Sequence, residues 1–211
     1  MDVGLLPVKA LAAAKQRLGP DFDPEERREI ARALLEDALD MCVSTPFLRW
    51  WVVTADEAAV SAARARGLDV VDDAGEGLNH ALSTAVRAAA GAGATSVTII
   101  PADVPLGIRD DIVDLLDTGA TSDLVLVPAP RDGGTNGLHM SPPDLVEPRF
   151  GPGSLQSYVE LADRRGLRCS ILGLERLTLD IDTVEDVARF LESSPSGHAA
   201  EALRRLRTAS G

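Results

Sequence analysis

Aromatic residues, cysteines and histidines are all scarce in this chain of 211 residues. Only 3% of the residues are aromatic, and there are two cysteines and three histidines. Cys42 and Cys169 lie far apart without Cys-x-x-Cys spacing, which argues against a zinc site and favours two reduced thiols over a disulfide. The histidines show no metal-ligand spacing, so surface or packing roles are expected for them. Any chemistry is therefore expected to rest on carboxylates, cations and glycines.

The chain also lacks a basic stripe and any long hydrophobic run. Its formal net charge is -12, so nucleic-acid binding is not expected, although a local pocket can still bind a small anion. No apolar run approaches the length that crosses a bilayer, and the residues around Asp2 do not resemble a signal peptide. We therefore expect a cytoplasmic protein whose partners are small molecules rather than nucleic acid or membrane.

Apolar runs and amphipathic segments alternate along the chain. The apolar runs are rich in Val, Ile and Leu, and they predict strands at 3–8, 48–55, 68–73, 96–103 and 123–130. Helical spacing predicts helices at 23–43, 56–67, 77–93 and 109–119. Unbroken apolar strands separated by helices indicate an α/β fold, with a Rossmann-like, mostly parallel sheet covered by helices on both faces.

The last third of the chain is less regular. A glycine-rich turn leads into a strand within 131–140, and a loop enters a helix within 151–166. A strand is expected at 167–173 and a helix within 177–193, with Thr183 as its cap. We expect one domain over residues 1–194, followed by a short linker and a C-terminal helix over 195–211.

Five charged residues lie at or just beyond the carboxyl ends of the expected strands. Ligands of open parallel sheets bind beyond the carboxyl ends of the strands. The charged residues at those ends are Lys9, Asp72, Asp103, Arg131 and Asp132. Their placement is the first argument for an enzyme or a ligand-binding site.

Three cations follow the first strand. Lys9, Lys15 and Arg17 lie in a loop of small residues, where they repel one another unless an anion joins them. The loop lacks the glycines of a Walker A loop or a dinucleotide fingerprint. A solvated basic turn is the alternative, but the position after the first strand favours phosphate binding.

A second candidate is the start of the helix at 77–93. Gly75 and Gly77 allow close backbone approach, and Asn79 offers both a donor and an acceptor, which suits the edge of a nucleotide base. The alternative for Asn79 is a helix cap.

The third candidate is a set of acids. Asp103 lies between Pro101 and Pro105, directly after a buried strand. Asp180 and Asp182 alternate on an extended segment, which predicts that they point to opposite faces and that one of them at most shares a ligand with Asp103. Carboxylates from two strand ends, completed by substrate phosphates, suit Mg2+. The alternative makes Asp180 and Asp182 loop acids or helix caps.

Two glycine-rich turns, at 131–138 and 150–158, form the fourth candidate. Gly151 frees the backbone, Thr135 and Ser154 supply hydroxyls, and Ser154 opens a helix. Backbone amides at a helix start, together with a hydroxyl, can bind an anion. These turns predict a second anion site, separate from the first cationic loop.

Six segments, in order, resemble the guanylyltransferases of deazaflavin-coenzyme biosynthesis, which act on 2-phospho-L-lactate or phosphoenolpyruvate. The resemblance covers about residues 5 to 193 and leaves out the last helix. The segments are PVKALAAAKQRL, GEGLNHAL, PADVPL, RDGGTNGL, FGPGSLQSY and LTLDIDTVEDV.

The resemblance implies a nucleotidyltransferase fold of the glycosyltransferase-A type. GTP would lie over the loop that holds Lys9, Lys15 and Arg17, with guanine near Gly77 and Asn79. Of these residues, Lys15 and Arg17 would also serve catalysis by steadying the pyrophosphate that leaves.

The same resemblance places the phosphorylated three-carbon acid at Thr135, Gly151 and Ser154. Asp103, as a catalytic residue, would hold Mg2+ together with one of two further acids. Those acids are Asp180 and Asp182.

Several alternatives stay open at this point. The richness in Ala, Arg and Gly favours phosphoenolpyruvate as acceptor over 2-phospho-L-lactate. A sugar-phosphate or molybdopterin nucleotidyltransferase on the same fold is a second reading, and a non-catalytic nucleotide-binding regulator is a third. A homodimer is left open as the assembly.

Overall fold

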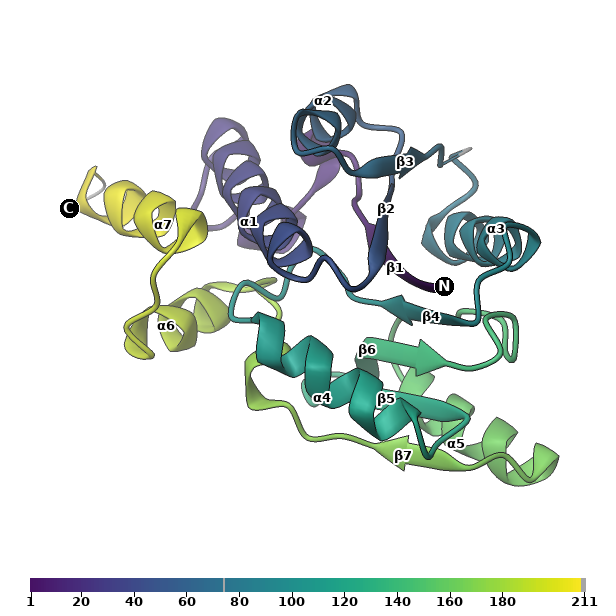
Figure 1. Ribbon diagram of the computed structural model, residues 1–211. Helices are drawn as coiled ribbons and strands as arrows, with labels where there is room; N and C mark the ends of the chain where they lie inside the picture. The colour runs from purple at the N-terminus through teal and green to yellow at the C-terminus, as the bar shows by residue number, and fades with distance from the viewer. Residues whose placement is uncertain (74, 210–211) are drawn as a thin grey trace.

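The computed structural model describes residues 1–73 and 75–209, and its centre is a seven-stranded sheet (Figure 1). The strands lie in the order β3-β2-β1-β4-β6-β5-β7. In the described chain, β6 alone runs antiparallel to its neighbours, so the expected mostly parallel α/β sheet is confirmed. The strands are β1 (Asp2–Pro7), β2 (Arg49–Val53), β3 (Asp69–Val71), β4 (Ser96–Ile99), β5 (Leu124–Ala129), β6 (Gly134–Met140) and β7 (Cys169–Ile171).

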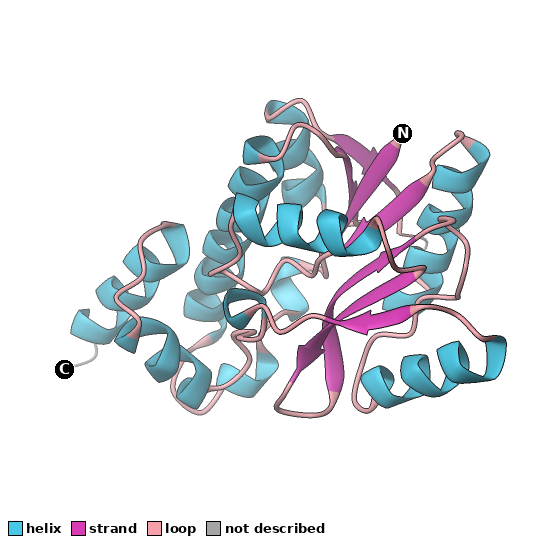
Figure 2. Ribbon diagram, turned by 60° about the horizontal axis from the view of Figure 1, so that its bottom comes forward, coloured by secondary structure: helices cyan, strands magenta, loops and turns pink. Residues whose placement is uncertain are grey.

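Helices cover both faces of the sheet (Figure 2). One apolar cluster joins one sheet face to α1 (Pro24–Ser44), α2 (Glu57–Ala65) and α4 (Arg109–Gly119). Another cluster joins the opposite face to α3 (Leu78–Gly91) and α5 (Ser154–Arg165). The sheet therefore has the two buried faces that its continuous Val, Ile and Leu runs predict.

Side-chain caps fix where several helices begin. The carboxylate of Asp23 accepts hydrogen bonds from the N–H groups of Glu25 and Glu26 at 2.7 and 2.9 Å, and Glu26 accepts one from the N–H of Asp23. Asp56 caps α2 in the same way, through Ala58 and Ala59. These bonds satisfy amide groups that have no partner inside the helix.

The strand expected at 96–103 is shorter than predicted. β4 ends at Ile99, and the last sheet hydrogen bond runs from the N–H of Ile100 to the carbonyl of Leu5 at 3.1 Å. Pro101 has no N–H to continue the ladder, so the chain turns away there. Asp103 is thereby carried beyond the carboxyl end of the sheet, and its carbonyl accepts a hydrogen bond from the N–H of Ile181 at 3.0 Å.

The last two helices, α6 (Val184–Glu192) and α7 (His198–Ala209), pack beside α1 (Figure 1). Phe190, Ala199 and Leu203 are fully buried in a third apolar cluster with residues of α1. The carboxylate of Asp37 in α1 accepts hydrogen bonds from the N–H groups of His198 and Ala199 at 2.7 and 2.9 Å. The C-terminal helix is therefore packed firmly against the rest of the protein, although the sequence resemblance does not include it.

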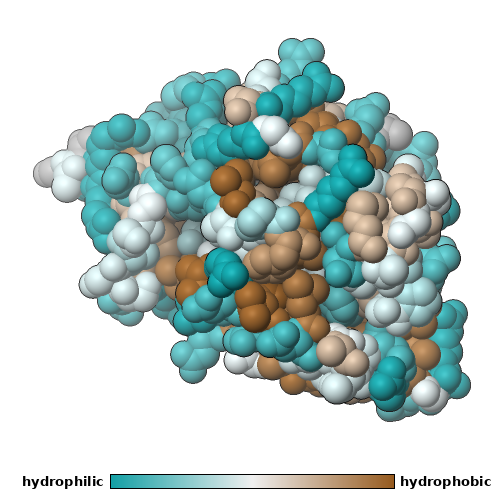
Figure 3. Space-filling model, viewed as in Figure 1, coloured by the Kyte–Doolittle hydropathy of each residue, from teal (hydrophilic) through white to brown (hydrophobic). Residues whose placement is uncertain are grey.

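The surface seen in Figure 3 alternates hydrophilic areas with several hydrophobic ones. Large hydrophobic side chains that remain exposed include Val43, Phe47 and Ile108, and Arg109 lies over the ring of Phe47. Over the described ranges, no helix combines the length and apolarity that a membrane crossing would need.

Candidate active site

A cleft of about 620 Å³ lies beyond the carboxyl ends of the central strands. It collects most of the residues that the sequence singled out. Those that line it are Lys9, Lys15, Arg17, Asp103, Arg131, Asp132, Thr135, Gly151, Asp180 and Asp182. Gly77, Asn79 and Ser154 flank it through Leu78, Phe150 and Thr135.

Asp72 does not line this cleft, contrary to the expectation that the five charged residues at strand ends lie together. It follows β3, which forms one edge of the sheet, whereas Asp103 follows β4 near the middle. Two strands separate these positions, so the carboxyl end of β3 opens on a different part of the surface.

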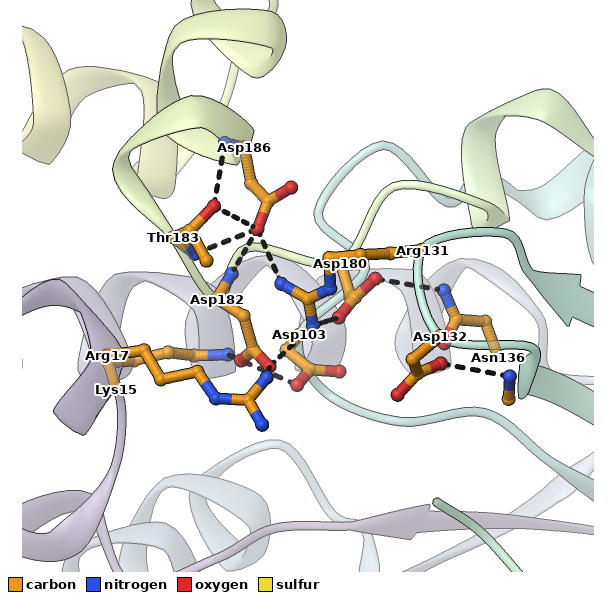
Figure 4. Close-up of polar contacts among 11 residues, drawn as sticks. Lys15, Arg17, Asp103, Arg131, Asp132, Asn136, Asp180, Asp182, Thr183 and Asp186 are labelled. Atoms are coloured by element: carbon orange, nitrogen blue, oxygen red, sulfur yellow. Dashed lines mark hydrogen bonds and ion pairs between the residues drawn. The ribbon is translucent and has the colours of Figure 1, made fainter. Parts of the chain in front are cut away.

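Lys15 extends into the acid cluster from the loop after β1 (Figure 4). Its backbone adopts a left-handed conformation (φ 56°) between two single-turn 3-10 helices, Leu11–Ala13 and Gln16–Leu18, which the sequence did not predict. Its Nζ lies 3.1 Å from Oδ2 of Asp103 and 3.3 Å from Oδ1 of Asp182, and 8% of the side chain is exposed. Burial alone would lower the pKa of Lys15, but the two carboxylates outweigh burial and raise that pKa. Lys15 is thus a buried cation that joins two acids.

Arg131 forms a second cationic centre in the same cleft. Its Nη2 lies 2.9 Å from Asp180 and 2.8 Å from Asp182, and its Nη1 lies 2.8 Å from Asp186. The prediction that Asp180 and Asp182 point to opposite faces is therefore wrong. Their segment is an irregular loop rather than a strand, so the alternation of strand side chains does not apply to it.

Asp186 is a site residue that the sequence analysis missed. Its Oδ2 accepts hydrogen bonds from the N–H of Asp182 at 3.1 Å, from the N–H and hydroxyl of Thr183 at 2.8 and 2.9 Å, and from Arg131. Thr183 in turn caps α6, as expected. The capping-box spacing of Thr183 and Asp186 was the available signal, because that motif turns an acid back toward the residue before the helix.

The carboxylates of the cleft differ in how they are neutralised. Burial raises the pKa of Asp182, but Lys15 and Arg131 outweigh it and hold that pKa below its usual value. Burial and the neighbouring charge of Asp103 raise the pKa of Asp180, although Arg131 opposes them. The carboxylates of Asp103 and Asp180 therefore repel each other, and a cation bound between them would reduce this repulsion.

This donor set suits a hard divalent cation. The described residues contain no group of three or more His, Cys, Asp or Glu side chains spaced to hold a metal ion. Mg2+, however, is usually held by one or two carboxylates plus waters and substrate phosphates. Asp103 and Asp180 both line the cleft and supply such a pair of carboxylates, so the residues present fit the ion.

The residues of the second predicted anion site lie around the start of α5. The hydroxyl of Ser154 donates to that of Thr135 at 3.0 Å, and both side chains are buried. Gly151 adopts a φ of 127°, which favours glycine, and its N–H has no acceptor among the described residues. The N–H of Gly153 donates to the carbonyl of Asp132 at 3.1 Å, which joins the two glycine-rich turns. Thr135, Ser154 and Gly151 are thus brought together as predicted.

Asn79 is held by backbone groups. Its Oδ1 accepts a hydrogen bond from the N–H of Phe150 at 2.7 Å, and its Nδ2 donates to the carbonyl of Phe150 at 3.1 Å. Gly77, with a φ of 97°, is the cap residue of α3, and no side chain caps that helix. The alternative that Asn79 is a helix cap is therefore wrong, while contact with a nucleotide base stays a prediction.

Sequence comparison identifies the family. A family described as "Guanylyl transferase CofC like" matches residues 2–210. The 2-phospho-L-lactate guanylyltransferase of Methanothermobacter thermautotrophicus is 35% identical over 204 residues, which cover 96% of this chain and 90% of that protein. The phosphoenolpyruvate guanylyltransferase of Rubrobacter xylanophilus is 35% identical over 191 residues, covering 90% of this chain and 93% of that protein.

Several solved structures with a similar fold are described as nucleotidyltransferases or nucleotide-diphospho-sugar transferases. A Desulfovibrio desulfuricans G20 protein assigned as a nucleotide-diphospho-sugar transferase aligns with a TM-score of 0.79 at 19% identity, covering 98% of this chain and 97% of its own. Rv0371c of Mycobacterium tuberculosis H37Rv, solved in complex with manganese, aligns with a TM-score of 0.54 at 20% identity, covering 91% of this chain and 98% of its own. With its nucleotidyltransferase fold, its acid-lined cleft and a family match over nearly its whole length, the chain belongs to the CofC-like guanylyl transferase family and is a nucleotidyltransferase.

Proposed function

We propose that this protein transfers GMP from GTP to the phosphate of phosphoenolpyruvate and releases pyrophosphate, as a step of deazaflavin-coenzyme biosynthesis. The same reaction on 2-phospho-L-lactate is the alternative, because relatives of near-equal similarity carry either name. The observation that carries the proposal is the Lys15 ion-pair cluster, which lies in one cleft with Gly151 and Thr135.

GTP would occupy the side of the cleft formed by the loop after β1. Lys9 and Arg17 line this side, and Arg17 reaches Asp182 at 3.4 Å while most of its side chain stays exposed. Exposed cations with free donors can bind phosphates. Guanine would lie near Gly77 and Asn79, at the start of α3.

The phosphorylated acid would occupy the other side of the cleft. The N–H of Gly151 and the hydroxyls of Thr135 and Ser154 would donate hydrogen bonds to its anionic groups. Gly151 and Ser154 lie at the start of α5, where the helix dipole favours negative charge, and Thr135 lies beside them on β6. Phosphoenolpyruvate is favoured as the acceptor by the composition of the chain alone, so the acid must be identified by assay.

Mg2+ would be held by Asp103 together with Asp180 or Asp182. The manganese found in the related Rv0371c supports a divalent ion of this kind. When bound, the ion would neutralise phosphate charge and align the two substrates.

The chain's own residues would then govern the reaction as follows. An oxygen of the acceptor phosphate attacks the α-phosphorus of GTP, forming a new P–O bond. The bond from that phosphorus to the bridging oxygen breaks, and pyrophosphate leaves with the electron pair. A phosphate monoester is already a nucleophile near neutral pH, so no general base is required. Lys15 and Arg17 would hold the departing pyrophosphate, because the barrier consists mainly of repulsion between anions.

The test is a pyrophosphate-release assay with GTP, Mg2+ and each acid in turn. Pyrophosphate release with one acid, and a product that contains both guanosine and that acid, is the expected result. Asp103→Asn should reduce turnover by at least a hundredfold, comparable to the loss of a strong electrostatic contact in other active sites. Absence of product with both acids would refute the proposed reaction, and near-wild-type turnover of Asp103→Asn would remove Asp103 from the mechanism.

A further inference from the structure

The contact between Asn79 and Phe150 joins two parts of the protein that lie 71 residues apart in the chain. Asn79 stands in the first turn of α3, whose helix packs against strands β1 and β2. Phe150 begins the loop that leads into α5, whose helix packs against β5 and β6. The side-chain amide of Asn79 therefore links the side of the cleft proposed for GTP to the side proposed for the phosphorylated acid.

The geometry of this contact is specific for an amide side chain. The carbonyl oxygen of Asn79 accepts from the N–H of Phe150 at 2.7 Å, and its amino group donates to the carbonyl of the same residue at 3.1 Å. An aspartate could keep the first bond but would oppose a carbonyl oxygen at the second. An alanine would lose both bonds.

The loop that Asn79 holds is part of the cleft wall. Phe150, Gly151 and Pro152 line the cleft, and Leu78, the neighbour of Asn79, lines it as well. The N–H of Gly151, which lacks an acceptor among the described residues, directly follows the residue that Asn79 fixes. A shift of Phe150 would therefore shift that donor.

Other anchors of the loop come from its own side of the sheet. The N–H of Arg149 donates to the hydroxyl of Tyr158 at 2.6 Å, and the N–H of Gly153 donates to the carbonyl of Asp132 at 3.1 Å. Tyr158 is fully buried in α5, where burial raises its pKa to about 12. These bonds fix Arg149 to α5 and Gly153 to the turn before β6, while Asn79 fixes Phe150 to α3.

We propose that Asn79 is a positioning residue for the acceptor acid, which acts by holding Phe150 so that the N–H of Gly151 points into the cleft. The inference rests on the proposed function, because it assigns the acid to the Gly151 side. It differs from base recognition by Asn79, which would affect GTP instead. Asn79, at the start of α3, thereby sets the position in which the phosphorylated acid binds.

The kinetic test compares Asn79→Ala and Asn79→Asp with His80→Ala, a matched exposed neighbour in the same helical turn whose side chain pairs with Glu76. Asn79→Ala loses both hydrogen bonds, and Asn79→Asp replaces one of them with repulsion between two oxygens, so KM for the acid should rise about tenfold in either variant. KM for GTP should change less than twofold, and His80→Ala should match the wild type. A rise in KM for GTP with an unchanged KM for the acid, or equal rises for both, would overturn the proposal.

A second measurement does not depend on activity. Hydrogen exchange of the Phe150 amide should accelerate at least tenfold in Asn79→Ala, because its acceptor is gone, while the amides of α3 and β1 keep wild-type rates. An unchanged exchange rate at Phe150 would show that Asn79 does not hold the loop, and would overturn the proposal. If the wild type acts on neither acid but Phe150 exchange responds as expected, the proposed function fails while the anchoring of the loop stands.

Discussion

Asp186 shows how one buried acid can organise a cluster of charges. A single oxygen of its carboxylate receives two backbone N–H groups, the hydroxyl of Thr183 and the guanidinium of Arg131. Arg131 extends from there to Asp180 and Asp182. The positions of two cleft carboxylates thus depend on an acid that does not itself line the cleft.

Replacing Asp186 with alanine should therefore affect both stability and activity. The change leaves Arg131 and the backbone groups without their acceptor, and breaking a buried ion pair costs about 3 kcal/mol of unfolding free energy. Urea denaturation measures this loss, and GMP transfer should also fall because Asp180 and Asp182 lose their fixed partner. Glu185→Ala, at the exposed neighbouring position, is the control and should change neither quantity.

His139 makes a prediction about pH. Its Nδ1 lies 2.9 Å from the hydroxyl of Thr98 on the paired strand, and its ring packs against Gly119, where an added Cβ would lie only 2.5 Å from it. Burial lowers the pKa of His139, although Asp2 opposes this shift. The sequence-based expectation of a packing role is confirmed for this histidine.

Because the pKa of His139 is lower in the folded chain, the unfolded chain takes up a proton first as the pH falls. The unfolding free energy should be fully retained above the unfolded pKa of about 6.5, and should decline as the pH drops through the lower folded value. In His139→Gln this part of the decline should vanish in denaturation curves between pH 8 and 5. His80→Gln, at an exposed site, should keep the wild-type slope; an unchanged slope in His139→Gln would contradict the assignment.

Among the secondary-structure elements, α7 depends on a cap from another helix. Asp37 of α1 accepts from the first two N–H groups of α7, and Gly197 approaches it so closely that an added Cβ would lie 2.6 Å from its carboxylate. Gly197 also has a φ of 110°, which disfavours other residues. The junction therefore needs both the acid and the glycine.

Asp37→Ala should lower the unfolding free energy by about 1 kcal/mol, the usual cost of a lost helix cap. Thermal unfolding followed by circular dichroism measures the loss. Asp114→Ala, an exposed acid on α4, serves as the control for removing one negative charge. Equal melting temperatures for Asp37→Ala and the wild type would mean that packing alone holds α7.

Most elements were predictable from sequence, because each depends on local pattern. The caps at Asp23 and Thr183 follow from residues within one helical turn, and the strand β1 from one apolar run. The pairing of Asn79 with Phe150 was not predictable, since it joins positions far apart in the chain. The shared contact of Asp180 and Asp182 was missed for a related reason, because an irregular loop has no fixed side-chain period.

On the scale of the whole molecule, the family match and the apolar core both include the C-terminal helix α7. The matched residues run from 2 to 210, and the third apolar cluster joins α1, α6 and α7. The sheet delivers cleft residues from strands that are distant in sequence, β1, β4 and β6 among them. Neighbouring strand ends therefore assemble the site, as they do in other open α/β sheets.

The ion pairs of the cleft bear on how the protein should respond to a chelator. Lys15 lies between Asp103 and Asp182, and Arg131 lies between Asp180 and Asp182, so these carboxylates have counter-ions from the chain itself. We expect excess EDTA to abolish GMP transfer but to lower the melting temperature by no more than about 2 °C, because Lys15 and Arg131 limit the repulsion between the carboxylates once the metal ion is removed. A fall of 10 °C in calorimetry would contradict this expectation. If the melting temperature stays unchanged as expected, folding of the enzyme does not depend on the magnesium concentration in the cell, and only its turnover does.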